Sequence, residues 1–219
     1  MIIKRGISFG AIHSYYDLGL ILSKVEIPAA KPKTSYIDIP GGDGSLDLSE
    51  VHGDVKYSDR ECEFTFTAAR TMSGSEWEAH KTMVSNALNG KAFRITLDKD
   101  PDYYFTGRCE IYSVPVNKRI RQIVVKAKVN PWKWKQGVTV LSFPLSATEK
   151  EIEIINARKK VCPMIECTND DTVIVWGDTS YYLNAGSHKV LDIQLSEGSN
   201  VLLVSGEGTI TFTWQEADL

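Results

Sequence analysis

The sequence predicts a mainly β protein of two domains, with one α-helix in the first domain. Three observations support this fold class: short segments in which apolar and polar residues alternate, one stretch with helical spacing, and a change of pattern after Pro131. The chain has 219 residues, of which 42% are hydrophobic and 24% are charged, and such values are typical of a globular protein. We therefore expect one domain at residues 1–133 and a second at residues 134–219.

The N-terminal domain is expected to be a β-sandwich-like structure whose strands have one buried face. In residues 61–70, ECEFTFTAAR, one cysteine and two phenylalanines alternate with glutamate and threonine, which is the two-residue period of a half-buried strand. Residues 121–130 alternate in the same way. Aromatic and β-branched side chains predict further strands in residues 91–97 and 103–114.

One helix is predicted at about residues 76–89. Ser75 and Glu78 have the spacing of a capping box, in which each side chain hydrogen bonds to the backbone of the other residue. Gly90 is suited to end the helix, because glycine readily takes a left-handed conformation. The helix carries an apolar stripe that is expected to cover a sheet, formed by Trp77, Val84 and Leu88.

A second, all-β domain is predicted after Pro131, where NPWKWKQG breaks the strand pattern. Short strands then follow one another, separated by turns rich in Gly, Asn, Asp and Ser and without a helical period. This pattern is typical of an antiparallel sandwich such as a jelly roll. Strands are expected at residues 138–143, 150–156, 163–168, 171–176, 180–184, 189–195, 200–205 and 209–214.

The charge and hydropathy of the chain argue against two classes of function. The net charge is −3, which gives no electrostatic reason to expect binding to nucleic acid. Residues 1–130 hold 18 Lys and Arg against 16 Asp and Glu (+2), and residues 131–219 hold 7 against 12 (−5). No apolar run reaches the roughly 18 residues of a membrane span, and the N-terminus lacks the apolar segment of a signal peptide. We expect folding in a cytoplasm and no membrane insertion.

No pattern of residues indicates a metal site, a cofactor or a catalytic centre. The four cysteines contain no CxxC pair and the four histidines are scattered, so the cysteines are expected to be core residues in a reducing compartment. The acids of residues 98–102 are expected in a solvated loop, and the cations of residues 118–121 at an exposed hairpin end. Nucleophile elbows and HExxH are absent, and an enzyme is not predicted.

Residues 38–50, DIPGGDGSLDLSE, concentrate glycines and acids. A phosphate-binding loop is excluded because no lysine follows Gly44, and an EF-hand is excluded because the acids have the wrong spacing. A calcium site of another type stays an alternative. The interpretation that we favour is a turn permitted by Gly41, Gly42 and Gly44.

A carbohydrate site is an alternative in the C-terminal domain. Sugars stack on exposed aromatic rings, and Trp176 and Trp214 are candidates for such stacking. Each of them ends an alternating run, however, and for that reason packing in the core is favoured for both.

Three N-terminal segments share a specific pattern: GISFGAIHSYYDLGLIL, YIDIPGGDGSLDLSE and VKYSDRECEFTFTA. The pattern F-G-x-x-H-S-Y-x-D-x-G-L, then I-P-G-x-D-G-x-L-D-L-S, then x-Y-x-x-R resembles the start of distal tail proteins of siphophages and prophages of Gram-positive bacteria. The resemblance is strong over residues 1–70. The order of the helix, strands and C-terminal sandwich agrees over the rest.

The resemblance implies a structural protein of the virion tail tip, made in the cytoplasm of the bacterial host. An N-terminal belt domain would form a hexameric ring, and a C-terminal galectin-like sandwich would project from it. One ring face would meet the tail-tube protein, and the other would meet a tail-associated baseplate or fibre protein. Gly41, Gly42 and Gly44 would lie in a loop near the ring interface, where they permit a backbone path that side chains would block. The alternative is a carbohydrate-binding module for the host cell wall, although the galectin sugar motifs are absent. A third hypothesis, a cell-wall hydrolase, lacks a convergent acid pair or metal triad.

Overall fold

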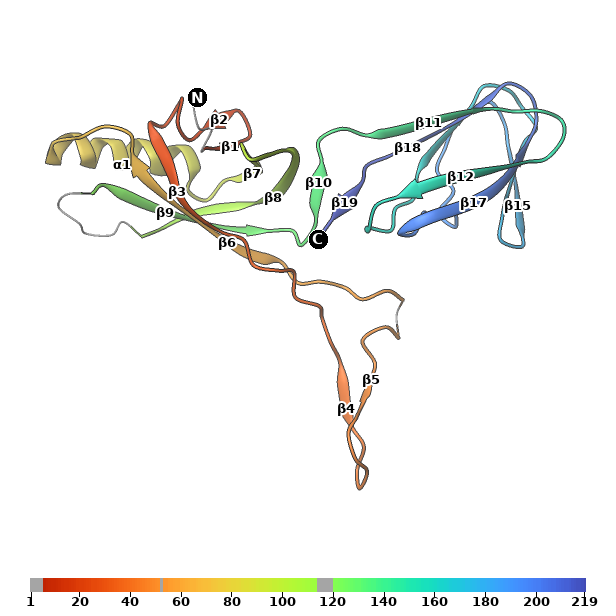
Figure 1. Ribbon diagram of the computed structural model, residues 1–219, viewed down its shortest axis with the longest axis horizontal. Helices are drawn as coiled ribbons and strands as arrows, with labels where there is room; N and C mark the ends of the chain where they lie inside the picture. The colour runs from red at the N-terminus through yellow and green to blue at the C-terminus, as the bar shows by residue number, and fades with distance from the viewer. Residues whose placement is uncertain (1–5, 52, 114–119) are drawn as a thin grey trace. The chain divides into compact units, whose positions relative to one another are not determined.

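The computed structural model confirms the mainly β fold class (Figure 1). The residues that it describes are 6–51, 53–113 and 120–219. The chain divides into two compact units, called unit 1 (residues 1–133 with Leu219) and unit 2 (residues 134–218). Among the described residues, one α-helix occurs, and it belongs to unit 1.

Unit 1 is built around an antiparallel sheet in which seven strands follow the order β2-β1-β7-β8-β9-β6-β3. The predicted alternation in two of these strands is confirmed, because Phe64 of β6 pairs with Val125 of β9 and both side chains are fully buried. The strands are β1 (Ile7–Phe9), β2 (Ile12–His13), β3 (Leu20–Glu26), β6 (Arg60–Ala68), β7 (Ala92–Leu97), β8 (Asp100–Ser113) and β9 (Gln122–Val129).

This sheet curls so that its two halves share one core. Phe9 in β1 and Phe64 in β6 are four strand positions apart, which would place them about 19 Å apart in a flat sheet with strands about 4.8 Å apart. Their ring centroids lie only 6.5 Å apart, and Phe9 lies 6.2 Å from Phe66. All three side chains are fully buried. The predicted sandwich-like packing of this domain is therefore confirmed.

Helix α1 spans Gly74–Leu88 and begins two residues before the predicted start. The capping box predicted from Ser75 and Glu78 was wrong. The N–H group of Glu76 donates to Ser73 Oγ at 3.3 Å, and the N–H group of Ser73 donates to Glu76 Oε2 at 2.7 Å. Both serine–glutamate pairs have the spacing of a capping box, so the sequence pattern could not separate them.

The apolar stripe and the glycine stop of α1 were predicted correctly. Gly90 has a φ of 73°, in the left-handed region that ends many helices. The stripe packs into the core of unit 1 through the buried side chains of Trp77, Val84 and Leu88.

Unit 2 is the antiparallel β-sandwich that the sequence predicts. One sheet has the strand order β11-β18-β13-β16 and the other has the order β12-β17-β14-β15. Ile154 of β12 and Phe212 of β18 belong to opposite sheets and are fully buried in one common core. The strands are β11 (Thr139–Pro144), β12 (Lys150–Asn156), β13 (Met164–Cys167), β14 (Thr172–Trp176), β15 (Thr179–Leu183), β16 (Gly186–His188), β17 (Gly198–Ser205) and β18 (Thr209–Trp214).

Residues 189–195, KVLDIQL, do not form the predicted strand. The chain turns here, and the N–H group of Ile193 donates to Val190 O at 3.2 Å. Ile193 and Leu195 are nevertheless fully buried, so the apolar residues of this segment fill the core from a loop. The preceding segment, which was expected to be a turn, supplies β16 instead.

Candidate assembly interface

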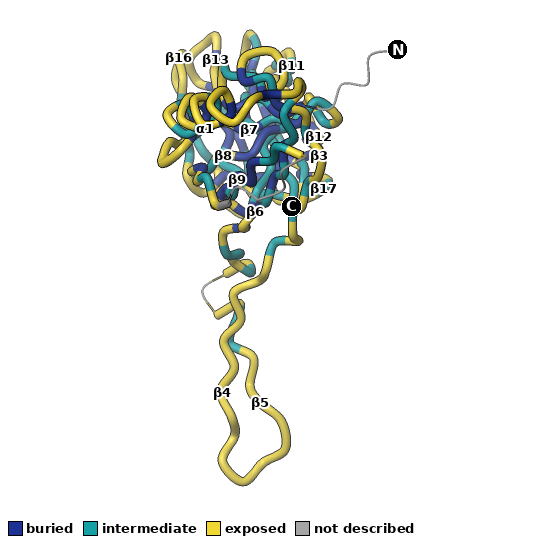
Figure 2. Tube along the Cα trace, turned by 90° about the vertical axis from the view of Figure 1, so that its left-hand side faces the viewer, coloured by how far each residue is buried: buried dark blue, intermediate teal, exposed yellow. Residues whose placement is uncertain are grey.

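A long arm interrupts unit 1 between β3 and β6. We define the arm as residues 27–59, and it carries a hairpin of β4 (Tyr36–Asp38) and β5 (Ser45–Asp47). Figures 1 and 2 show that this hairpin extends away from the sheet of unit 1 and is exposed along its length. The glycine-rich stretch that was expected to form a turn lies at the tip of the hairpin.

The hairpin has one apolar face and one polar face. Ile37 and Leu46 are register partners, so their side chains lie next to each other on the same face. Ile39 follows Ile37 at the two-residue strand period and continues this face. The opposite face carries Tyr36, Asp38, Ser45 and Asp47.

The apolar face of the hairpin is left uncovered by the residues that the structure describes. Ile37 is 55% exposed, Leu46 is 53% exposed and Ile39 is 50% exposed. A two-stranded hairpin in water is only marginally stable by itself, and it gains stability when an apolar face packs on another structure. A row of half-exposed aliphatic side chains on a projecting hairpin is therefore typical of a surface that a partner covers.

The glycines at the tip are needed for backbone conformation rather than for space. Gly41 has a φ of 74° and Gly44 has a φ of 78°, which side chains rarely adopt. An added Cβ atom at either position would meet nothing within 4 Å. A side chain at these two positions would therefore be disfavoured by backbone strain rather than by a clash with a neighbouring atom. Only Gly42 is crowded, since a Cβ atom there would lie 3.1 Å from Ile39 Cγ2.

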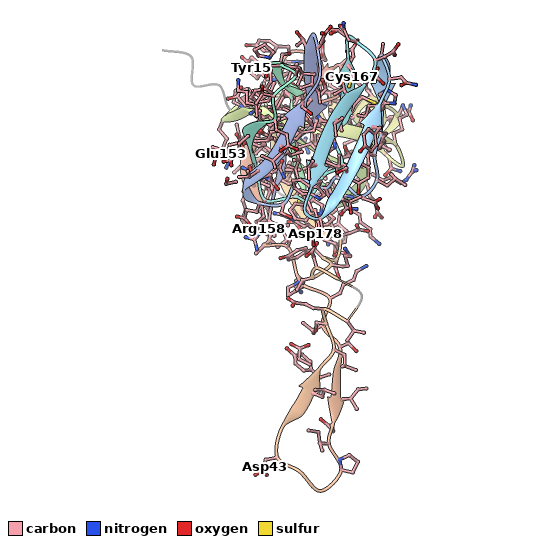
Figure 3. All side chains as sticks on the ribbon, turned by 90° about the vertical axis from the view of Figure 1, so that its right-hand side faces the viewer. Tyr15, Asp43, Glu153, Arg158, Cys167 and Asp178 are labelled. Atoms are coloured by element: carbon pink, nitrogen blue, oxygen red, sulfur yellow. The ribbon has the colours of Figure 1, made fainter. Side chains whose placement is uncertain are left out.

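The distal part of the arm is uniformly acidic. Residues 34–51 contain four acids and no Lys or Arg, and Figure 3 shows the side chain of Asp43 at the far end of the arm. Ser45 Oγ donates to Asp38 Oδ1 at 2.7 Å. Hydrogen bonds from the hydroxyl and the N–H group of Ser49 lower the pKa of Asp47, so this carboxylate stays ionised near neutral pH.

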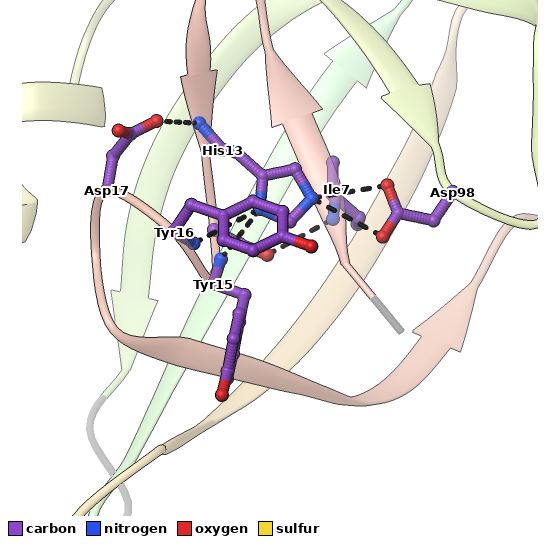
Figure 4. A network of polar contacts seen from close by, with 7 residues as sticks. Ile7, His13, Tyr15, Tyr16, Asp17 and Asp98 are labelled. Carbon is purple, nitrogen blue, oxygen red and sulfur yellow. Dashed lines mark hydrogen bonds and ion pairs between the residues drawn. The ribbon is translucent and has the colours of Figure 1, made fainter. Parts of the chain in front are cut away.

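A compact turn near the N-terminus, residues 13–19, is organised by His13 (Figure 4). The N–H groups of Tyr15 and Tyr16 donate to His13 Nδ1 at 3.1 and 3.2 Å. On the other side of the ring, His13 Nε2 lies 3.2 Å from Asp98 Oδ1, and the proton of this bond sits on Nε2 because a carboxylate only accepts. Asp17 Oδ2 accepts from the N–H group of His13 at 2.6 Å.

This turn explains most of the first N-terminal motif as structure. Ser14 is fully buried, and its Oγ accepts from the N–H group of Ile7 at 3.1 Å. Gly19 takes a φ of 60° as the chain enters β3. Tyr15 and Tyr16 remain 47% and 72% exposed. The contact between His13 and Asp98 joins residues 85 positions apart, and no local pattern could have predicted it.

The two tryptophans proposed for sugar stacking lie against the core of unit 2. Trp214 is only 4% exposed, so it has no free ring face for a sugar. Trp176 is half-buried and packs against the same core. Another aromatic side chain of this unit, Tyr182 in β15, is 78% exposed.

The described residues show no activated nucleophile among the cysteines. Burial raises the pKa of Cys62 to about 11 and the pKa of Cys109 to about 12, and it also raises the pKa values of Cys162 and Cys167. Thiols of this kind are inert structural groups. No group of three His, Cys, Asp or Glu suited to a metal occurs within residues 6–51, 53–113 and 120–219.

Three further observations concern residues singled out from the sequence. The expected solvated loop at residues 98–102 was wrong in part, because Asp98 contacts His13, and Asp100 and Asp102 belong to β8. His52 and residues 118–119 lie outside the described residues. In the part of the chain that the structure describes, no helix has the length and apolar character to cross a membrane.

The fold of the two units, one with a curled sheet, a helix and a projecting arm and the other a β-sandwich, is similar to that of a solved phage hub protein. One solved structure that matches is the crystal structure of the Dit protein (gp 19.1) of SPP1, described as a paradigm of the hub adsorption apparatus in phages that infect Gram-positive bacteria. The match has a TM-score of 0.72 and 14% sequence identity, and it covers 98% of this chain and 99% of that chain. Neither a family model nor a curated protein matches the sequence. The fold expected from the N-terminal resemblance is thereby confirmed.

Proposed function

We propose that this chain is a structural distal tail protein of a siphophage, which forms a hexameric ring hub between the tail tube and the host-adsorption apparatus. The observation that carries the proposal is the arm. It is an amphipathic hairpin whose apolar face is not covered by the described part of its own chain, within a fold that matches a phage hub protein over 98% of this chain. Such a hairpin supports assembly with a partner rather than catalysis.

The distribution of charge supports a second copy of this chain as the partner of the arm. The arm holds 3 Lys and Arg against 6 Asp and Glu, a net charge of −3. The rest of residues 1–133 holds 16 against 10 (+6), and residues 134–219 hold 6 against 12 (−6). The acidic arm is therefore complementary to unit 1 of a neighbouring copy and is repelled by unit 2.

A closed ring requires this kind of asymmetry between two surfaces of one subunit. In a cyclic assembly each copy presents two different surfaces, one that donates a contact and one that receives it. The arm serves as the donating surface, and the positively charged body of unit 1 serves as the receiving surface. The two faces of the ring are then left for the tail-tube protein and for a tail-associated baseplate or fibre protein.

The proposal is tested by the state of association of the full chain. Mass photometry and small-angle scattering at increasing protein concentration, with and without the tail-tube protein, are expected to show six-subunit particles. Particles of the size of one chain at high concentration and with the tail-tube protein present would contradict the proposal. The partner matters in this test, because a ring can depend on the surfaces that flank it.

A further inference from the structure

The two legs of the arm are joined to each other at the root of the arm. The N–H group of Lys33 donates to Lys56 O at 2.7 Å, and the N–H group of Ser58 donates to Lys31 O at 2.9 Å. Tyr57 lies in the second leg between these two hydrogen bonds. Because these two hydrogen bonds hold the legs together at the root, a displacement of the hairpin moves both legs there.

The segment through which the chain leaves unit 1 starts beside this root. We call residues 130–133 the exit segment, because unit 2 begins at the next residue. The second leg of the arm enters the sheet at Arg60, the first residue of β6, and the exit segment follows Val129, the last residue of β9. Arg60 and Val129 are register partners. The arm therefore ends, and the exit segment starts, next to two residues that face each other across one strand pair.

The guanidinium group of Arg60 bridges the two segments. Its Nη1 donates to Pro28 O, in the first leg of the arm, at 3.4 Å. Its Nη2 donates to Pro131 O, in the exit segment. The group lies over the ring of Phe105 in β8, 5.6 Å from the centroid. One side chain thus holds the arm and the exit segment against the same part of the sheet.

A second contact runs parallel to this bridge. The ring of Tyr57 packs edge-on against the ring of Trp132 in the exit segment, with the centroids 5.6 Å apart. The backbone N–H group of Trp132 donates to Asn130 Oδ1 at 3.1 Å, and this hydrogen bond fixes the turn that carries the indole ring. Arg60 and Tyr57 are also the two residues that define the third N-terminal motif, Y-x-x-R.

Stability alone is a poor explanation for an arginine at this position. Arg60 is only 7% exposed, and no carboxylate of the described residues forms an ion pair with it. Its Nε atom also has no hydrogen-bond partner within the described part of the chain. A buried charge of this kind is usually less favourable than an apolar side chain of the same volume. The guanidinium group supplies instead a rigid fork of donors that reaches two carbonyl groups in fixed geometry.

We propose that Arg60 and Tyr57 form a latch that couples the position of the arm to the position of the exit segment, so that docking of the arm is transmitted to the chain entering unit 2. That the arm docks on another copy rests on the proposed function. The latch itself is a property of one chain. Because coupling is reciprocal, a partner that fixes the exit segment also biases the arm toward one position.

The latch can be tested on the free full-length chain labelled with 5-fluorotryptophan. The ¹⁹F resonance of Trp132 is assigned by its loss in Trp132→Phe. The arm root is perturbed by Lys33→Pro, which removes the hydrogen bond to Lys56. This substitution is then combined with Arg60→Met, with Arg60→Lys, or with the control Arg94→Met. Arg94 also stacks on an aromatic ring, 4.7 Å from the centroid of Tyr104, but within residues 6–51, 53–113 and 120–219 no hydrogen bond, ion pair or ring contact joins its side chain to the arm root or to the exit segment.

The expected result is that Lys33→Pro shifts or broadens the Trp132 resonance in the wild-type and Arg94→Met backgrounds. In both Arg60 backgrounds the effect should fall by at least about twofold, because one of the two contacts that carry the coupling is lost. An equal effect in all backgrounds, or no effect in the wild type, would overturn the latch. Unchanged resonances of Trp77 and Trp214 show that a variant is folded, and Arg60→Lys replaces Arg60→Met if the latter fails this criterion. A chain that never forms rings would refute the proposed function and leave this result intact.

Discussion

Replacement of the two paired aliphatic residues on the arm, Ile37→Ala with Leu46→Ala, should weaken assembly without weakening the fold. Each side chain is about half exposed in the free chain, at 55% and 53%. Full burial of such a side chain contributes about 1.5–3 kcal/mol, so covering the remaining half of both contributes about 2 kcal/mol for each interface. This corresponds to a roughly 30-fold higher dissociation constant for each arm contact.

The assay is sedimentation velocity over a range of protein concentrations, with mass photometry of the same samples. A matched control is Val138→Ala with Val140→Ala in unit 2, since these side chains are 60% and 52% exposed and lie outside the arm. Thermal unfolding of both double variants should stay close to that of the wild type, because exposed substitutions usually change stability by less than about 0.5 kcal/mol.

The reasoning would be refuted if the arm variant assembled at the same concentration as the wild type while the control variant did not. Such a result would place the assembly contact on unit 2 and leave the exposed apolar face of the arm unexplained. Equal assembly of all three proteins would show that the arm face contributes nothing to association.

Four further predictions concern single residues. Gly44→Val should introduce about 1–2 kcal/mol of local backbone strain at a φ of 78° and so weaken ring formation. The thermal unfolding of unit 1 should stay unchanged. Normal assembly of this variant would contradict the prediction. His13→Ala should lower the free energy of unfolding by about 1–3 kcal/mol, because two backbone N–H groups and Asp98 lose their partner. Asp98→Ala should lower the free energy of unfolding by less, and denaturant titration measures both variants. Trp214→Ala should cost about 3–5 kcal/mol by the same measurement, whereas a sugar-stacking residue would be dispensable for the fold. Cys62, whose pKa is raised to about 11, should be inert to a thiol reagent at pH 8 in the folded chain and should react in denaturant. Because the pKa of this thiol is higher in the folded than in the unfolded chain, its contribution to the free energy of unfolding should be lost as the pH rises from about 9 toward 11.

The parts of the fold that the sequence predicted well are those in which one local period decides the structure. Phe64 and Phe66 alternate with polar residues, and burial of one face follows directly from that alternation. The stripe that contains Trp77 and Val84 follows from the helical period in the same way. The start of α1 was misplaced because two serine–glutamate pairs have identical spacing and only the path of the preceding chain distinguishes them.

The parts that the sequence could not predict depend on contacts between distant residues. The segment at residues 189–195 alternates like a strand, yet a turn bends it, and Ile193 reaches the core from a loop. The sequence predicted only a turn where the arm lies. Ile37 and Leu46 each alternate with polar residues, and this pattern is the same whether a core or a partner covers the apolar side chains. The contact between Arg60 and Pro131 spans 71 residues, and a local pattern contains no information about it.

Electron microscopy of the purified full-length chain tests the central claim most directly. Images recorded at high protein concentration, alone and with the tail-tube protein, should show rings with six-fold symmetry, and the arm of each subunit should lie on unit 1 of its neighbour. Single-chain particles under both conditions, or rings in which the arms contact no neighbouring subunit, would contradict the account.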